Sequence, residues 1–432
     1  MTDVATRSPL RTEEMATRVE RRLKARYAAE RRFRWYGIAA IAFALGFLAL
    51  LFASIVAKGW TAFQQTMVRL DVEFAAETLD ATGKREPEAL STADYQALVR
   101  DSLARAFPEV TDRRDRRELT ALVSSGAAYV LREMVMADPA LVGQRRQVWL
   151  PASDDIDVVM KGAGFSEAGR LSERQVAWAT RLVAADALDL RFNVDFFTKG
   201  DSREPELAGI WGATVGSFLT LLVCLTISFP IGVMAAVYLE EFAPKNRFTD
   251  LIEVNINNLA AVPSIVFGLL GLAVFLGVFG MPRSAPLVGG LVLALLVMPT
   301  IIIAGRAALK AVPPSIREAA LGVGASRLQV VTHHVLPLAM PGLLTGAIIG
   351  MAHALGETAP LLMIGMVAFI VDVPGGVLDP ATVLPVQVYL WADSPERAFV
   401  ERTSAAILVL LAFLISMNLV AVVLRKRFEQ RW

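Results

Sequence analysis

Six long apolar runs alternate with polar stretches along this chain of 432 residues. A bilayer core about 30 Å thick needs roughly 20 apolar residues in a helix, and each run reaches that length. The runs cover residues 36–57, 210–239, 254–281, 284–305, about 341–371 and 403–424. The pattern predicts six membrane-spanning helices, the fifth of them interrupted by His353 and Glu357. The first run is too long for a cleavable signal and lacks a small-residue cleavage site.

The stretch between the first two runs, residues 58–206, has the composition of a soluble domain, with 20 basic and 25 acidic side chains. Apolar residues at helical spacing predict helices in STADYQALVRDSLARAF and RELTALVSSGAAYVLREMV, whereas alternation predicts strands in MVRLDVEFA and RQVWLPA. We expect a small α+β insert. Its DRRDRRE cluster, residues 112–118, is open to two interpretations: an anion site, or the more common solvated helix start with mixed charges.

Composition and charge place the chain in a membrane. With 55% hydrophobic and 20% charged residues, it does not fit a single soluble globular domain. Residues 1–34 hold ten Lys and Arg against five acidic residues, and residues 425–432 hold four against one. The positive-inside rule therefore predicts that both termini of this multi-pass inner-membrane protein are cytoplasmic. The insert is then extracytoplasmic, and residues 306–340 form a cytoplasmic loop.

This cytoplasmic loop predicts two short helices. Ser315 stands three residues before Glu318, the spacing of a capping box that starts a helix. Two glycines, the second of them Gly324, interrupt that helix, and Ser326 is placed to cap another that Pro337 ends. We expect a helical hairpin.

The first helix of the hairpin presents small side chains, Ala319 and Ala320, beside the charge of Glu318. Small side chains let a short helix lie deep in the groove of a partner protein. The hairpin is therefore a candidate docking element.

The hairpin residues resemble the EAA loop of binding-protein-dependent ABC importer permeases. The resemblance implies an all-α polytopic fold with six transmembrane helices and a MetI-like importer core, to which the α+β insert is added. It also implies that the loop couples to a separate ATPase through Glu318, Ala319, Ala320, Gly324, Leu336 and Pro337. His334 departs from the aliphatic residue that is usual there.

No ATPase site of its own is expected, because the only Gly-Lys pair, Gly83-Lys84, lacks the preceding glycine of a phosphate-binding loop. No catalytic constellation is expected either. A metal site at the adjacent His333 and His334 is improbable, since neighbouring helical positions point in different directions and no other His or Cys is near.

Two further segments narrow the resemblance: AAVPSIVFGLLG, residues 260–271, and AHALGETAPLL, residues 352–362. They look like the phosphate-specific permeases of the PstA type, a resemblance that covers roughly residues 205–428. It implies phosphate as substrate and, as partners, a second permease of the PstC type, ATPases of the PstB type and a phosphate-binding protein of the PstS type. It implies no cofactor and no nucleic acid.

Candidate residues of the translocation pathway lie in or beside the apolar runs. His353 and Glu357 are four residues apart and can pair; ionisable residues inside a membrane are functional candidates by default, although the pair can also serve only helix packing. Thr358 adds a hydroxyl. Arg306 adds a cation, or a simple positive-inside anchor. Ser264, after a proline, marks either an exposed helix N-terminus or only a kink.

One departure from the resemblance concerns His353, because the family usually has arginine before ALGET. Arginine stays charged, whereas histidine titrates near neutrality. We hypothesise that transport through this protein depends on pH more strongly than through a relative with arginine.

The expected organisation is a basic N-terminus at residues 1–34, a first span at 35–57, the insert at 58–206 and the permease domain at 207–428. A permease for molybdate, sulfate or phosphonate is an alternative, against which the GETAPLL segment argues. A membrane sensor, with the insert as its receiver, is a second alternative. Detection of a bound ATPase would separate the importer from the sensor.

Overall fold

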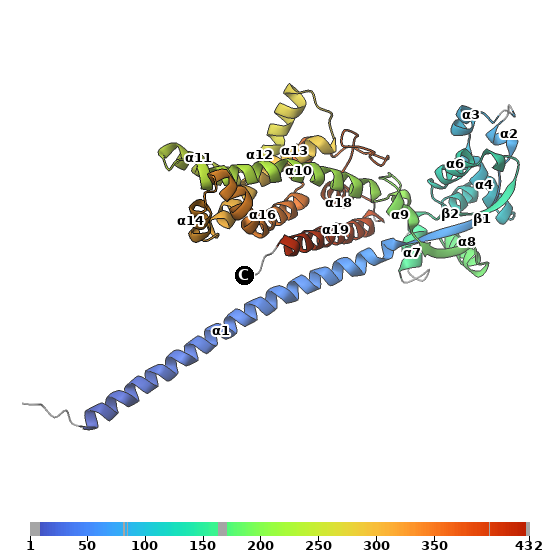
Figure 1. The fold of residues 1–432 in the computed structure, drawn as a ribbon. Helices are drawn as coiled ribbons and strands as arrows, with labels where there is room; N and C mark the ends of the chain where they lie inside the picture. Colours follow the sequence, from blue (N-terminus) through green and yellow to red (C-terminus); the bar gives the residue numbers. More distant parts are fainter. Residues whose placement is uncertain (1–8, 81–82, 84, 163–170, 397, 429–432) are drawn as a thin grey trace, which may run out of the picture. The chain divides into compact units, whose positions relative to one another are not determined.

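The structure is a computed structural model that describes residues 9–80, 83, 85–162, 171–396 and 398–428 (Figure 1). Lys84 of the Gly-Lys pair and the ends of both basic tails lie outside the described residues. The chain divides into two compact units, Met1–Ala57 and Lys58–Trp432. The first unit is described from Pro9 and consists of most of one long helix, α1 (Pro9–Gly59). All other elements belong to the second unit.

A three-stranded antiparallel sheet lies at the centre of the insert, in the order β2-β1-β3. The strands are β1 (Gln64–Glu73), β2 (Arg145–Pro151) and β3 (Leu188–Phe192). Leu150 and Leu188 both lie opposite Val68, on either side of the central strand. The alternating apolar residues of β1, with Val68, Leu70 and Val72 buried, turn one face of the sheet to the core. The two predicted strands are thus confirmed, and β3 was not predicted.

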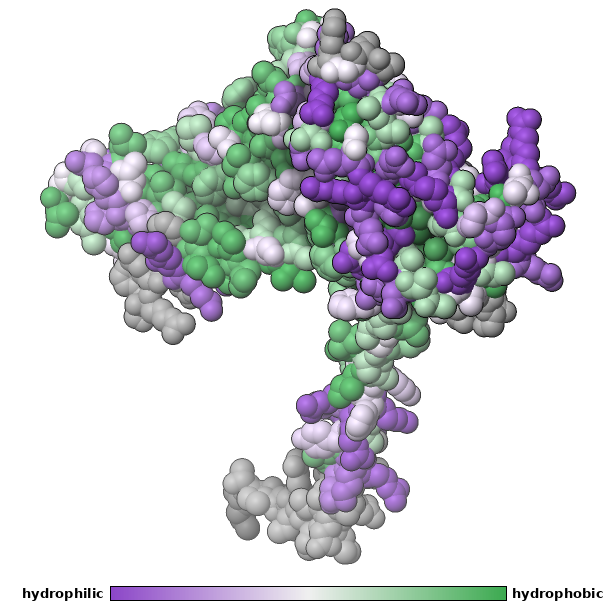
Figure 2. Space-filling view, turned by 90° about the vertical axis from the view of Figure 1, so that its right-hand side faces the viewer, coloured by the Kyte–Doolittle hydropathy of each residue, from purple (hydrophilic) through white to green (hydrophobic). Residues whose placement is uncertain are grey.

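Short helices pack against this sheet and around the insert core. They are α2 (Ala76–Leu79), α3 (Pro87–Thr92), α4 (Tyr95–Ala106), α5 (Arg113–Thr120), α6 (Ala127–Ala137), α7 (Asp154–Lys161), α8 (Glu173–Ala184) and α9 (Val194–Thr198). The helical spacing noted in the sequence corresponds to α4 and to α5 with α6. Figure 2 shows hydrophilic side chains over much of the face that the insert presents.

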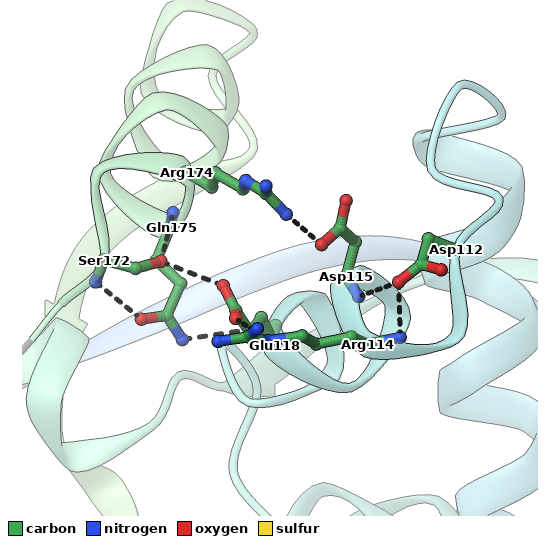
Figure 3. A network of polar contacts seen from close by, with 7 residues as sticks. All are labelled: Asp112, Arg114, Asp115, Glu118, Ser172, Arg174 and Gln175. Carbon is green, nitrogen blue, oxygen red and sulfur yellow. Dashed lines mark hydrogen bonds and ion pairs between the residues drawn. The ribbon is translucent and has the colours of Figure 1, made fainter.

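The DRRDRRE cluster forms the start of α5, and its acidic side chains are paired (Figure 3). Asp112 caps the helix by accepting from the backbone N–H of Arg114, at 2.8 Å. Asp115 pairs with Arg174 of α8, and Glu118 accepts a hydrogen bond from the Ser172 hydroxyl at 3.1 Å. The network holds α5 against α8, which supports the interpretation of the cluster as a mixed-charge helix start.

The remainder of the second unit is helical. Its helices are α10 (Trp211–Val237), α11 (Arg247–Ala260), α12 (Ser264–Leu270), α13 (Pro286–Lys310), α14 (Pro314–Gly322), α15 (Arg327–Gln329), α16 (Leu336–Gly356), α17 (Ala359–Met363), α18 (Leu384–Ala392) and α19 (Ala398–Phe428). Helix α13 packs between α10 and α16. A Cβ on Gly290 would lie 2.5 Å from the Val223 side chain, so this glycine lets α13 approach α10 closely.

Among the described residues, five helices are long and apolar enough to cross a membrane, and a sixth span results if one bent pair is counted as a single span. That pair, Arg247–Ala260 with Ser264–Val278, bends by 101°. The sequence analysis left two possibilities at Ser264, a new helix N-terminus or a kink; α12 begins there as a separate helix, because Pro263 cannot continue the hydrogen-bond ladder of α11. The all-α polytopic fold with a small sheet in the insert is confirmed.

The fifth apolar run also differs from its expected form. Helix α16 begins at Leu336 and ends at Gly356, and Glu357 has an extended backbone. The short α17 follows from Ala359, with Pro360 in its first turn. Residues 357–371 therefore do not continue a span, because the chain leaves the helical conformation at Glu357 and only the short α17 follows.

Buried contacts join the insert to the helical part of the second unit. The Lys161 ammonium, 5% exposed, pairs with Asp157 of α7 at 2.6 Å and with Glu401 of α19 at 3.0 Å. The indole Nε1 of Trp391 in α18 donates to Oδ1 of Asp201 in the insert at 2.9 Å. Aromatic and small residues complete the junction: Ala62, Phe196, Trp391, Phe399 and Ala405 share one core cluster.

Candidate functional site

The first helix of the predicted hairpin is α14. Its N-cap is Pro313, which has an extended backbone, and Ser315 lies inside the helix. The predicted capping box between Ser315 and Glu318 is therefore wrong, because the N-cap lies two residues earlier, at Pro313. Glu318 and Ala319 are exposed, whereas Ala320 packs into a core with neighbouring helices.

The turn after α14 follows the sequence prediction. Gly324 has φ +90, in the left-handed region that other residues adopt only with strain. The Ser326 hydroxyl accepts from the backbone N–H of Gln329, so the predicted cap at Ser326 is confirmed; the Gln329 side chain accepts in turn from the N–H of Ser326, which completes a capping box. The chain thus reverses between two short helical segments.

The second arm of the hairpin does not stop at Pro337. It runs through α15 and a π-helical turn, Val330–Val335, into α16, so that residues 327–356 form one continuous helical segment. The predicted stop at Pro337 is wrong because Pro337 lies in the first turn of α16, directly after the wider π turn, where its missing N–H is tolerated. The hairpin is thereby joined directly to a membrane-spanning helix.

The two arms enclose a hollow of about 480 Å³. It is lined by Ile316, Ala319, Ala320, Val323, His333, His334, Pro337 and Leu338. At the tip, Val323 is 86% exposed and Leu328 is 63% exposed. Leu336 is half-buried beside the hollow and does not line it. The small side chains of Ala319 and Ala320 line part of this hollow, and exposed apolar side chains lie at its rim. Such a surface suits the docking of another protein.

Arg317, which the sequence reasoning did not select, fastens α14 to the membrane helices. Its guanidinium contacts both carboxylate oxygens of Glu241, the shortest distance being 2.6 Å, and donates to the carbonyls of Val312 and Leu309 at 2.7 and 2.9 Å. Glu241 belongs to the π-helical turn that ends α10. A forked arginine–carboxylate pair fixes orientation as well as distance. The signal in the sequence was a charged residue directly before Glu318.

His353 and Glu357 are brought together as the spacing predicted, with 2.7 Å between Nε2 of His353 and Oε1 of Glu357. The His353 side chain is 56% exposed and that of Glu357 is 19% exposed. Because Glu357 lies just past the end of α16, the pair links the last turn of this helix to the residue that follows it. Thr358 is the N-cap of α17, and its carbonyl accepts from the N–H groups of Leu361 and Leu362.

Ser264 is the first residue of α12, directly after the 101° bend. Helix α12 packs on α17, where a Cβ on Gly268 would lie 2.6 Å from the Cα of Pro360. The segments that follow Ser264 and Thr358 are thus neighbours. On the other side of the bend, Asn257 and Asn258 of α11 are exposed; the sequence reasoning missed these amides, although each interrupts an apolar run.

Arg306 is paired with acidic side chains. Its Nη2 lies 2.6 Å from Oε1 of Glu253 in α11, and its Nε lies 3.5 Å from Glu240. Lys310 also reaches Glu240, at 3.6 Å. Arg306 therefore links α13 to α11 and to the end of α10, and its charge is compensated within the chain.

Glu206 is the most perturbed acidic group of the insert junction. Its residue is 6% exposed, and this burial raises the pKa of its carboxyl to about 7, although a hydrogen bond with Ser124 acts in the opposite direction. The negative charges of Glu204 and Asp154 raise the pKa further. Glu206 lies four residues before Ile210, the N-cap of α10. Its protonation therefore affects the segment that connects the insert to the permease helices.

Family models match two parts of the chain. One, described as a domain of unknown function (DUF3333), matches residues 20–169. The other, described as the binding-protein-dependent transport system inner membrane component, matches residues 228–432. The second match contains the hairpin, both arms of the bend that follows α11, and the His353–Glu357 pair.

Curated relatives include phosphate transport permeases. PstA 1 of Mycobacterium tuberculosis (strain CDC 1551 / Oshkosh) is 32% identical over 227 residues, which are 52% of this chain and 74% of that protein. PstA of Haemophilus influenzae is 30% identical over 227 residues, 52% of this chain and 79% of that protein. Among solved structures, the inward-facing MetNI methionine ABC transporter is similar with 18% identity and a TM-score of 0.39, over 51% of this chain and 95% of that one.

Proposed function

The chain belongs to the family of PstA phosphate transport permeases, and we propose that it is the transmembrane permease subunit of an ATP-driven importer of inorganic phosphate. The 32% identity over three quarters of a PstA protein carries this proposal. The hairpin geometry supports it, since an exposed docking element is joined without a break to a membrane-spanning helix. Permease subunits of this kind are generally not enzymes themselves.

A permease of an ABC importer works with an ATPase and an extracytoplasmic binding protein. The ATPase of the PstB type would grip the hairpin at Glu318, Ala319, Val323 and the surrounding hollow. A second permease of the PstC type would complete the pathway, and a binding protein of the PstS type would deliver phosphate. A nucleotide shifts a conformational equilibrium only through its different affinities for the two states. The ATPase therefore has to stay bound to the hairpin while it opens and closes, so that its own shift is transmitted to the permease.

The protein is a multi-pass inner-membrane protein. We further propose that its termini and its hairpin are cytoplasmic and its insert extracytoplasmic, as the positive-inside rule predicts. Phosphate would pass the His353–Glu357 pair, Thr358 and Ser264, close to the broken span between α11 and α12. Arg306, paired with Glu253, would fix helices at the cytoplasmic side. The proposed domain boundaries, at residues 34, 57 and 206, follow from the same topology.

The coupling role is tested by a matched pair of glycine variants. Gly324→Val forces a β-branched residue into φ +90. Gly322→Val adds the same side chain at the other exposed glycine of the hairpin, where φ is negative and an added Cβ would meet no neighbouring group within 4 Å. We expect the ATPase to co-purify with the wild type and with Gly322→Val. With Gly324→Val, either co-purification or the coupling of hydrolysis to uptake should fall at least tenfold. Absence of any ATPase from the wild-type complex would favour a sensor and overturn the proposal.

A further inference from the structure

An exposed cluster of aromatic side chains lies at the root of the insert. We define the aromatic patch as Trp60, Phe63, Phe192 and Phe197. Trp60 is 64% exposed, Phe192 is 65% exposed and Phe197 is 36% exposed. Exposed aromatic groups that touch one another mark an interaction surface in a folded protein.

Ring contacts make the patch continuous. The ring centroids of Trp60 and Phe63 are 5.9 Å apart, those of Phe63 and Phe197 are 5.4 Å apart, and Phe192 stacks on Phe197 at 5.6 Å. The patch draws on two separate segments, the 3₁₀ turn Trp60–Phe63 and the end of β3 with α9. Its exposure is therefore built into the fold and does not come from one protruding side chain.

A buried asparagine holds the two segments together. Asn193, 1% exposed, donates from Nδ2 to the carbonyl of Ala62 at 3.2 Å, and its Oδ1 accepts from the backbone N–H of Phe196 at 3.0 Å. The backbone N–H of Asn193 also donates to the carbonyl of Phe63. These bonds fix the aromatic patch as a rigid surface.

Contacts with α19 place the patch at one end of a membrane-spanning helix. A Cβ on Gly59, next to Trp60, would lie 2.9 Å from the backbone N of Ala405. The Phe196 ring, beside the patch, contacts the Trp391 ring, whose centroid lies 5.9 Å from that of Phe399. The patch thus lies level with the first turns of α19, where the apolar run of residues 403–424 begins.

We propose that the aromatic patch lies in the headgroup region of the outer leaflet and seats the insert on the lipid surface. Tryptophan and other amphipathic rings are enriched where membrane helices leave the hydrocarbon core. The patch lies beside the start of the apolar run of α19, and contact with lipid would remove its exposed aromatic area from water. The inference rests on the membrane topology and is independent of the substrate that the permease carries.

The single cysteine of the chain, Cys224, makes a depth measurement direct. On a Cys224→Ala background, a nitroxide is attached through Phe192→Cys or Phe197→Cys, and the full chain is placed in phosphatidylcholine–phosphatidylglycerol vesicles. Collision rates with oxygen and with a water-soluble nickel complex then report depth. Controls are Glu88→Cys, exposed in the insert, and Ile415→Cys, 62% exposed in the middle of α19.

We expect the labels at positions 192 and 197 to lie between the two controls in depth, near the headgroups. Labels at positions 192 and 197 that are as accessible to nickel as the label at position 88 would overturn the proposal. Low collision rates with both reagents would show that protein covers the patch, which also contradicts it.

A second readout uses the fluorescence of Trp60, one of seven tryptophans in the chain: lipids brominated near the headgroup should quench the wild type more than Trp60→Phe. Equal quenching of both would again count against the lipid contact.

Discussion

The His353–Glu357 pair is the residue-scale feature on which the proposed pathway depends most. The family usually has arginine in place of His353, and arginine keeps its charge at every physiological pH. His353→Arg should therefore give phosphate uptake a flatter pH profile between about pH 5.5 and 8. Labelled uptake across this range measures the effect, with the pH profile of the wild type as the reference. An unchanged profile in His353→Arg would show that the histidine does not set the pH dependence.

Glu206 gives the insert junction a pH dependence of its own. Its folded-state pKa is raised to about 7 by burial, so the folded state holds a proton that the unfolded chain has released above its ordinary pKa near 4.5. The stabilising effect is complete below about pH 4.5 and is lost as pH rises through 7. The loss is on the order of 3 kcal/mol, at about 1.4 kcal/mol for each pH unit.

The corresponding measurement is thermal stability in detergent at pH 5 and pH 7.5. The wild type should lose more stability over this interval than Glu206→Gln, in which the titrating group is absent. Glu88→Gln, which removes an exposed carboxylate elsewhere in the insert, is the control. Equal losses in the wild type and Glu206→Gln would mean that Glu206 is not protonated in the folded protein.

Local rules of helix geometry predicted some residues of the site and failed at others. Gly324 and Ser326 were predicted because a glycine after a helix and a serine before the next one are recognised from a few neighbouring residues. The Ser315 cap failed because Pro313 and Pro314 started the helix first, and the stop at Pro337 failed because a π turn precedes it. Arg317 was missed because its partner, Glu241, is 76 residues away in the chain.

At the scale of elements, the link between α14 and the end of α10 is the contact that relates docking to the membrane helices. Arg317 makes this link with five hydrogen bonds, three of them to Glu241. Removing one partner of a buried pair costs about 3–5 kcal/mol. Since the Arg317 side chain is 23% exposed, the lower end of that range applies here.

Arg317→Ala should accordingly release α14 and raise the ATP hydrolysed per phosphate transported several-fold. Arg317→Lys keeps the charge, loses the forked geometry and should fall between the wild type and Arg317→Ala. Arg327→Ala, an exposed arginine in α15, serves as the control. A wild-type ratio of ATP hydrolysed to phosphate transported in Arg317→Ala would show that Arg317 does not couple α14 to the membrane helices. A double-mutant cycle with Glu241→Ala measures the interaction energy of the pair itself.

Elements were predicted best where periodicity was long. The helices of the permease and two strands of the insert followed from it, whereas β3 was missed because five residues with one buried position, Leu188, give almost no alternation. The bend after Ala260 was expected only as one of two possibilities at Pro263. A proline indicates that the hydrogen-bond ladder of a helix is interrupted, but it does not indicate the angle of the bend. The angle between α11 and α12 depends on the packing of α12 against α17.

At the scale of the whole molecule, the insert and the permease helices share buried contacts across large sequence separations. Lys161 reaches Glu401 across 240 positions, and Trp391 reaches Asp201 across 190. Alternation and spacing carry no information about such pairs, so the junction could not be predicted from the sequence. The topology, in contrast, follows from charge counts alone and stays a prediction.

The central claim is that this chain carries phosphate through the membrane at the expense of ATP hydrolysed by a partner. The most direct measurement is uptake of labelled phosphate by phosphate-starved cells in which the chain is deleted and then restored, with molybdate and sulfate uptake followed in parallel. We predict that phosphate uptake alone is lost and recovered. Normal phosphate uptake after deletion, with no other phosphate importer active, would contradict the claim, and loss of molybdate or sulfate uptake instead would assign the permease to a different oxyanion.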